Sequence, residues 1–160
     1  MIRRDDSAAT GPDAATAASP RWAAGHAGAV RVLLVDGSQV VRERLRSLIA
    51  ETVPGLLIAE AANVEAALGL LHAPGPDAVV LDLNLPDGGS FRLLRETRRQ
   101  VPGCVAVVLA SYTEPAFRTA CREYGVEHFF SKSREFERVP EVLAELRRAR
   151  NPTGNSPPTL

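Results

Sequence analysis

Three charged residues stand at the ends of apolar runs, where the chain is expected to leave a β-sheet. Asp36 follows the run VLLV, Asp82 lies within AVVLDLNLP, and Lys132 follows HFFS. A lone aspartate after a strand is usually a turn former or a helix cap, so each residue by itself says little. On nearby parallel strands, however, the three would bring two carboxylates and one ammonium into a single pocket, where carboxylate chemistry could proceed beside a positive charge.

Asp82 gives the strongest signal of the three. It interrupts a run of apolar neighbours, where an unpaired carboxylate would cost several kcal/mol. Lys132 is the natural partner, because it is the sole lysine among 19 basic residues. A chain that otherwise uses arginine and has one lysine after a strand indicates a need for a compact ammonium rather than a planar guanidinium. A single exposed lysine with no such role is the alternative.

The elements that must position these residues alternate along the chain. Apolar runs of strand length are each followed by a stretch with helical spacing. The runs begin at Val32, Leu56, Ala78, Val105 and Val126. Continuous Val/Leu runs are typical of strands buried on both faces. The pattern predicts an α/β fold, a doubly wound parallel five-stranded sheet with strand order 2-1-3-4-5, whose ligands bind beyond the carboxyl ends of the strands.

Polar residues precede four of the expected helices. Their side-chain oxygens can accept an orphan N–H of the first turn. These residues are Ser38, Asn63, Thr113 and Ser133.

Length and composition predict one packed domain with two flanks. The 160 residues are 45% hydrophobic and 24% charged, and Lys+Arg 19 balances Asp+Glu 19, which disfavours a nucleic-acid surface. Residues 1–30, rich in alanine, are predicted to be a flexible leader, 31–150 the domain, and 151–160, rich in proline, a disordered tail. Two cysteines without metal spacing, no signal peptide and no long apolar run predict a cytoplasmic protein without membrane contact.

From about Arg31 to Ala149 the chain resembles the CheY-like receiver domains of two-component response regulators. The resemblance rests on VLLVDG at 32–37, VVLDLNLPDGG at 79–89, VVLASY at 107–112 and FFSKS at 129–133. It implies a (βα)5 flavodoxin-like sandwich and a stand-alone receiver. Such a receiver accepts a phosphoryl group from a histidine kinase or phosphotransfer protein, acts on a downstream protein target, and has no enzymatic activity beyond its own phosphorylation and dephosphorylation.

The resemblance also implies roles for individual residues. Asp82 would be the phosphoacceptor, and Lys132 would pair with its carboxylate or with the phosphoryl oxygens. Asp36, Asp82 and the backbone carbonyl of Asn84 would bind Mg²⁺, and Phe129 would be the aromatic switch. This chemistry is reasonable, because a carboxylate can attack a phosphoryl group in line while cations neutralise the transferring oxygens.

Two positions depart from the family pattern. Gly37 stands where the family has a second acid, which predicts weakened Mg²⁺ binding; a positive φ at this glycine is the alternative explanation. Ala110 stands where the family has a switch hydroxyl, with Ser111 next to it. These departures favour a second hypothesis, a pseudo-receiver that binds partners independently of phosphate, whereas Asp36, Asp82 and Lys132 together favour the phosphorylated receiver.

Other functions have little support in the sequence. The LNLP segment after Asp82 does not match the aspartate-nucleophile phosphatases, and no glycine-rich nucleotide motif occurs. Only ten residues follow Arg150, so we expect no DNA-binding output within this chain. The partner surface, and a possible homodimer contact, would be helix 4, strand 5 and helix 5, as the family resemblance implies. Residues expected to be exposed there are Arg118, Arg122, Glu127, Arg134 and Glu137.

Overall fold

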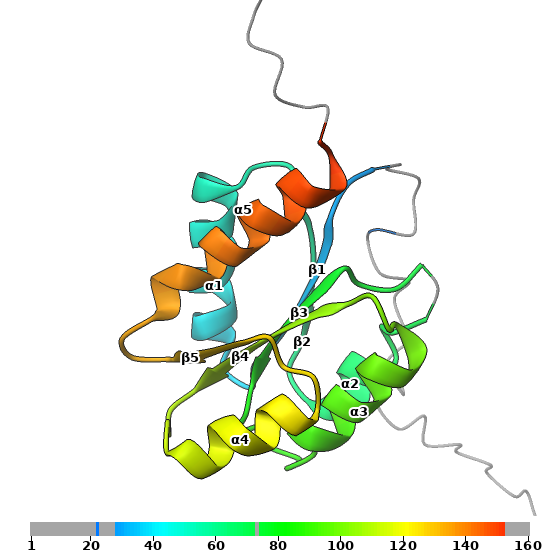
Figure 1. Ribbon diagram of the computed structural model, residues 1–160. Helices are drawn as coiled ribbons and strands as arrows, with labels where there is room; N and C mark the ends of the chain where they lie inside the picture. Colours follow the sequence, from blue (N-terminus) through cyan, green and yellow to red (C-terminus); the bar gives the residue numbers. More distant parts are fainter. Residues whose placement is uncertain (1–21, 23–27, 73, 153–160) are drawn as a thin grey trace, which may run out of the picture.

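A parallel sheet lies between two layers of helices in the computed structural model, which describes residues 22, 28–72 and 74–152. The strands are β1 (Arg31–Val35), β2 (Leu57–Ala61), β3 (Ala78–Asp82), β4 (Val105–Ala110) and β5 (His128–Ser131). Their order is β2-β1-β3-β4-β5 and every pair is parallel, which confirms the predicted topology (Figure 1).

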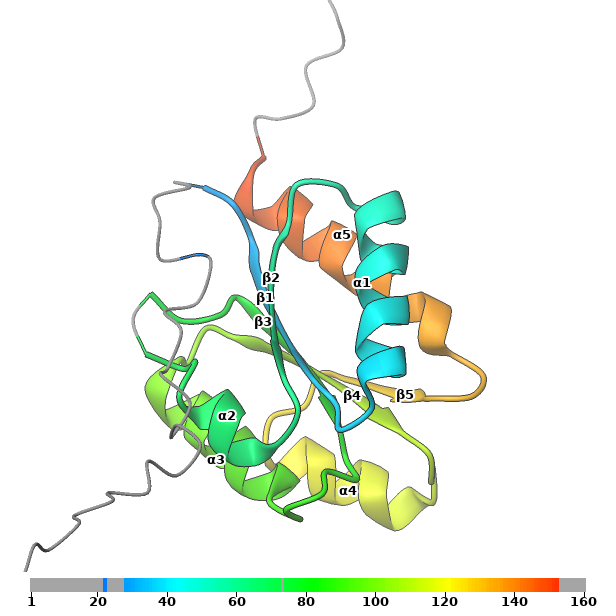
Figure 2. The ribbon, with the colours of Figure 1, turned by 180° about the vertical axis from the view of Figure 1, so that it is seen from behind.

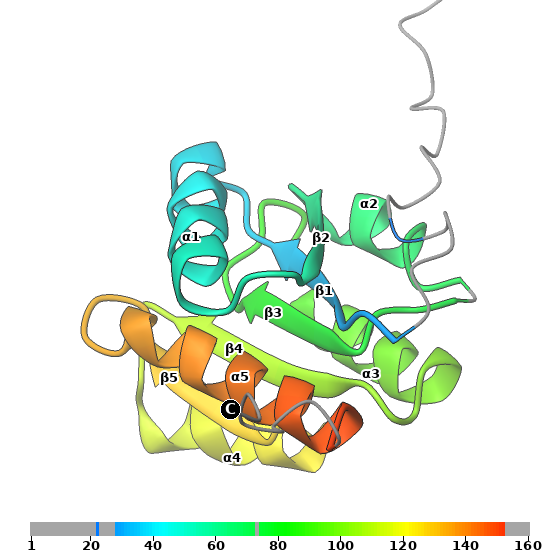
Figure 3. The same cartoon turned by 90° about the horizontal axis from the view of Figure 1, so that it is seen from above.

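Five α-helices cover the two faces of this sheet. They are α1 (Gln39–Thr52), α2 (Val64–Leu68), α3 (Ser90–Gln100), α4 (Pro115–Glu123) and α5 (Val139–Arg150), the last preceded by a 3-10 turn, η2 (Phe136–Arg138). Helices α1 and α5 lie on one face and α2, α3 and α4 on the other (Figures 2 and 3). Each face has its own apolar core, one around Leu33 and Leu81, the other around Leu34 and Leu143.

The strands differ in burial according to their place in the sheet. All of β3 is buried, and β1 and β4 are buried except at their first residues. The edge strands β2 and β5 are mostly half-buried, so the expectation of burial on both faces is wrong for them. The reason is that an edge strand has a sheet neighbour on one side only.

Two of the predicted helix starts are confirmed. Ser38 accepts the N–H of Val41, and Asn63 accepts the N–H of Ala66. Thr113 and Ser133 are not caps, because Glu114 precedes α4 and a 3-10 turn intervenes before α5.

Two residues of the predicted leader lie in the apolar core. Trp22 and Val30 are only 3% and 1% exposed. The remainder of the leader, apart from residues 28 and 29, lies outside the described residues, as do 153–160 of the tail. Beyond the amino ends of the strands, the buried carboxylate of Asp77 pairs with Arg31 and with Arg150, the last residue of α5. Asn151 Nδ2, just after α5, also donates to Gly28 O at 3.2 Å, so residues of the two flanks meet at the end of the sheet opposite to Asp82.

None of the helices in the described part of the chain is long and apolar enough to cross a membrane.

Candidate functional site

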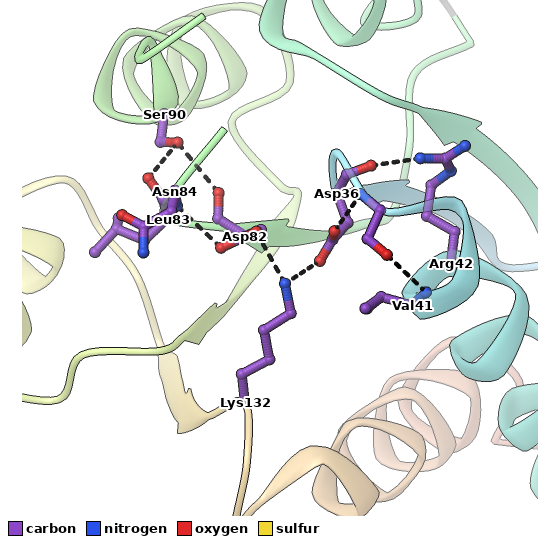
Figure 4. Close-up of polar contacts among 9 residues, drawn as sticks. Asp36, Val41, Arg42, Asp82, Leu83, Asn84, Ser90 and Lys132 are labelled. Atoms are coloured by element: carbon purple, nitrogen blue, oxygen red, sulfur yellow. Dashed lines mark hydrogen bonds and ion pairs between the residues drawn. The ribbon is translucent and has the colours of Figure 1, made fainter. Parts of the chain in front are cut away.

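Lys132 joins two aspartates at the carboxyl ends of the strands. Its Nζ lies 2.6 Å from Asp36 Oδ2 and 2.9 Å from Asp82 Oδ2 (Figure 4). The aspartates are only 3% and 7% exposed. The structure thus brings together the three charged residues from β1, β3 and β5, because strands 1 and 3 are neighbours and strand 5 ends at the same edge of the sheet.

Backbone amides fix the other oxygen of each carboxylate. Asp36 Oδ1 accepts the N–H of Ser38 at 2.8 Å, and Asp82 Oδ1 accepts the N–H of Asn84 at 2.9 Å. An aspartate that accepts the amide two residues further on stabilises the turn that leaves the strand. Each carboxylate is therefore held on both sides, by its own turn and by the ammonium.

The Lys132 side chain is charged at neutral pH despite its partial burial. Burial alone would lower its pKa, but the hydrogen bonds and negative charges of Asp36 and Asp82 together raise that pKa above its ordinary value. The backbone of Lys132 is also fixed, since its N–H donates to Ala110 O at 2.9 Å. This bond continues the β4–β5 pairing by one residue and aligns the lysine with the end of the sheet.

Two polar residues that the sequence did not single out, Ser90 and Arg42, donate hydrogen bonds to the backbone at and next to the aspartates. Ser90, the first residue of α3, donates through Oγ to Leu83 O at 2.8 Å and to Asp82 O at 3.1 Å. Arg42 Nη1 donates to Asp36 O at 2.6 Å, while its Nε pairs with Glu60 at 3.2 Å. No sequence signal predicts these bonds, because their acceptors include backbone carbonyls, which every residue has.

Part of the LPDGG segment after Asp82 has a structural role. The Asp87 carboxylate accepts the N–H of Val64 at 2.9 Å, and so caps the amino end of α2. Gly88 has a φ of +68°, a region that favours glycine. A Cβ at Gly89 would lie 3.2 Å from Val64 Cγ2, so the loop packs closely on α2. The motif therefore joins the loop after β3 to the neighbouring helix.

The family of the chain follows from its similarity to known proteins. The response regulator receiver domain matches residues 32–144. The chain belongs to this family. It is 37% identical over 84 residues to the DNA-binding transcriptional activator DevR/DosR of Mycobacterium tuberculosis, covering 52% of this chain and 39% of that relative. It is 33% identical over 125 residues to a protein-glutamate methylesterase/protein-glutamine glutaminase of Treponema denticola, covering 73% and 33%.

Solved structures agree with this assignment. The crystal structure of a CheY-like receiver domain protein from Methanospirillum hungatei has a TM-score of 0.69 and 17% identity, covering 79% of this chain and 99% of that chain. This likeness shows the receiver fold. The chain spans roughly a third to two fifths of the length of the two curated relatives above. It is a receiver domain of the kind found in response regulators of two-component systems.

The expected switch residues lie near the receiver site without joining it. Ala110 is 1% exposed and pairs with Ser131 in the sheet, while Ser111 is exposed. No hydrogen bond joins Ser111 to Asp82 within the described residues. The Phe129 ring is half-buried under the guanidinium of Arg118, whose carbon lies 4.7 Å from the ring centroid and whose Nη1 donates to Phe129 O at 3.3 Å. This aromatic position is therefore held by a cation from α4.

The expected partner surface is mostly exposed. Arg122, Glu127, Arg134 and Glu137 are exposed as predicted. Arg118 is half-buried, so that expectation is wrong for this residue, because its guanidinium packs on Phe129.

The site offers few side-chain ligands for the Mg²⁺ that receiver domains generally bind. No cluster of three or more His, Cys, Asp or Glu side chains able to hold a metal ion occurs in the described residues. The two acids that do converge are both paired with Lys132. Cys104 is a poor candidate for a nucleophile or metal ligand, since burial raises the pKa of its thiol to about 12. The pair of acids and their ammonium are therefore the chemical centre of the site.

Proposed function

We propose that this receiver accepts a phosphoryl group on Asp82 in two-component signal transduction. The observation that carries the proposal is the Asp82 carboxylate itself, buried at the end of a central strand and paired with Lys132 at 2.9 Å. Burial excludes most of the water that would solvate the carboxylate, and the two hydrogen bonds orient it for attack. The donor would be a histidine kinase or a phosphotransfer protein.

The reaction balances as a single displacement at phosphorus. An Asp82 carboxylate oxygen forms a bond to phosphorus while the bond from phosphorus to the donor imidazole nitrogen breaks, and that nitrogen keeps the electron pair. The product is an acyl phosphate on Asp82 and a free histidine. Lys132 would stay beside the acceptor and neutralise charge on the transferring oxygens, which are the groups that most need stabilisation in this reaction.

Mass spectrometry after treatment with a small phosphodonor, such as acetyl phosphate, tests the proposal. Wild-type protein should gain the mass of one phosphoryl group, and Asp82→Asn should gain none. Asp87→Asn is the matched control, since Asp87 lies in the same loop but caps α2, and it should label like wild type. Equal labelling of wild type and Asp82→Asn would refute Asp82 as the acceptor.

Absence of labelling in wild type would favour a pseudo-receiver, whose partner surface is independent of phosphate. Gly37 and Ala110 are the residues that favour this second candidate. In either case we place the contact with a downstream target on α4, β5 and α5, where charges of both signs are exposed. This face could also pair with its own copy. We do not extend to this chain the DNA-binding and methylesterase activities named for the relatives. Its cytoplasmic location and its lack of nucleic-acid and membrane partners stay predictions.

A further inference from the structure

The two aspartates of the site have no carboxylate oxygen left without a partner. Asp36 Oδ1 and Asp82 Oδ1 each accept a backbone N–H, from Ser38 and Asn84. Asp36 Oδ2 and Asp82 Oδ2 both contact Lys132 Nζ, at 2.6 and 2.9 Å. A divalent cation would bind these same Oδ2 atoms, so it and the ammonium compete for one position.

The surrounding charges favour the ammonium in that competition. Two carboxylates and Lys132 leave one net negative charge, and the Arg42 guanidinium, which donates to Asp36 O at 2.6 Å, is compensated by its own pairing with Glu60. A divalent ion that entered beside Lys132 would face the like charge of the ammonium at short range. If instead it displaced Lys132, a largely buried ammonium would lose both of its counter-ions, which is costly.

The position that would supply a third acid is tight against its neighbour. A Cβ added at Gly37 would lie 3.0 Å from Pro86 Cγ and 3.1 Å from Pro86 Cδ. The proline comes from the loop that follows Asp82, so an acidic side chain at position 37 would require this loop to shift by a few tenths of an ångström. The lack of a third acid and the placement of the acceptor loop are therefore two aspects of one packing arrangement.

We propose that the Lys132 ammonium is the resident cation of this site and takes the place of a divalent ion between Asp36 and Asp82. The proposal builds on the proposed phosphoacceptor site, but it concerns the unphosphorylated protein and can be tested there. It means that Lys132 neutralises both carboxylates before a phosphoryl group arrives, and that Mg²⁺ at ordinary cellular concentrations leaves the pair intact.

Because Lys132 is the sole lysine, lysine-selective ¹⁵N/¹³C labelling gives one side-chain spin system that belongs to this residue. The labelled wild-type protein is titrated with MgCl₂, and separately with NaCl at matched ionic strength. The Lys132 Nζ and Cε signals should follow the same course in both titrations, up to about 10 mM Mg²⁺. A saturable shift that Mg²⁺ produces and NaCl does not would overturn the proposal.

A second measurement uses variants that free the carboxylates. In Lys132→Met the two acids lose their cation, so Mg²⁺ should bind at least about tenfold more tightly than to wild type, seen as a melting temperature that rises with Mg²⁺. Asp36→Asn/Lys132→Met is the matched control, and its rise should be much smaller because one acid is gone. A Lys132→Met protein that folds but melts independently of Mg²⁺ would contradict the proposal.

These results are distinguishable from failure of the proposed function. The titrations require no phosphodonor, so they hold whether or not Asp82 is labelled. If the Lys132→Met protein does not fold, the titration of the wild-type lysine still decides the question.

Discussion

Trp22 offers a strong test of how far the domain extends beyond its family match. It lies ahead of residues 32–144, which match the receiver family, yet it is 3% exposed and belongs to the core on the α2 and α3 face. Helix α2 on that face has only five residues, Val64–Leu68. We infer that Trp22 covers apolar surface that such a short helix leaves open. Trp22→Ala should therefore destabilise the whole domain.

The expected magnitude follows from the burial. Replacing a fully buried tryptophan by alanine costs about 3 to 5 kcal/mol, because apolar contacts are lost and a cavity remains. A domain of this size has a total stability of about 5 to 15 kcal/mol, so the melting temperature should fall by about 10 to 20 °C. Trp22→Phe should cost far less, since it keeps a large ring, and the indole Nε1 that it removes has no hydrogen-bond partner among the described residues.

Denaturation followed by circular dichroism compares wild type, Trp22→Ala and Trp22→Phe. Trp22 is the sole tryptophan, so the fluorescence of native wild-type protein reports directly on its surroundings, and its emission should shift to longer wavelength on unfolding. A truncated protein beginning at Gly28 should be destabilised as much as Trp22→Ala. Equal midpoints for wild type and Trp22→Ala, or native emission at the wavelength of solvated tryptophan, would refute the reasoning.

Two further predictions concern the site and the partner surface. Lys132→Ala should lower the free energy of unfolding by about 3 to 5 kcal/mol in chemical denaturation at neutral pH, because it leaves two buried carboxylates without their cation. Since the folded-state pKa of Lys132 is raised above 10.5, its stabilisation is fully present below that pH and is lost as the pH rises through the folded value. The difference in unfolding free energy between wild type and Lys132→Ala should thus persist from neutral pH to about pH 10 and shrink above it. Equal unfolding free energies at pH 7 would mean that Lys132 is merely exposed. Sedimentation equilibrium should show self-association through α4, β5 and α5, weakened by Arg122→Glu but not by Arg95→Glu on α3; a monomer at high concentration, with and without phosphodonor, would remove the homodimer.

The sequence was sufficient to predict the central strands and the meeting of Asp36, Asp82 and Lys132. Strands β1, β3 and β4 are nearly continuous Val/Leu runs, and their burial in a parallel sheet follows from that composition. Once the strand order is 2-1-3-4-5, the carboxyl ends of strands 1, 3 and 5 lie at one edge, and the charges that follow them converge.

Features that depend on contacts between distant residues could not be predicted in the same way. The composition of residues 1–30 indicates too little apolar surface for a core of their own, but it does not indicate that Trp22 packs on the core of the domain. The bonds from Arg42 to Asp36 O and from Ser90 to Leu83 O end on backbone carbonyls, which leave no mark in the sequence. Glu135 accepts the N–H of Ser131 at 2.8 Å in the β5–α5 loop, and α5 begins only after the 3-10 turn Phe136–Arg138, so the expected cap at Ser133 is absent.

Gly37 shows why a missing residue in a family motif requires a structure to interpret. From the sequence, a lost metal ligand and a glycine required by positive φ explain it equally well. The second explanation is wrong, because the glycines with positive φ in the described residues are Gly28, Gly55, Gly88 and Gly125. The first is incomplete, because a Cβ at position 37 would lie 3.0 Å from Pro86 Cγ, so restoring the acid would also require Pro86, in the loop after Asp82, to shift by a few tenths of an ångström. Lys132 lies between the two remaining acids and compensates one of their two negative charges. The departure at Gly37 is therefore consistent with the positions of its neighbours rather than an isolated loss.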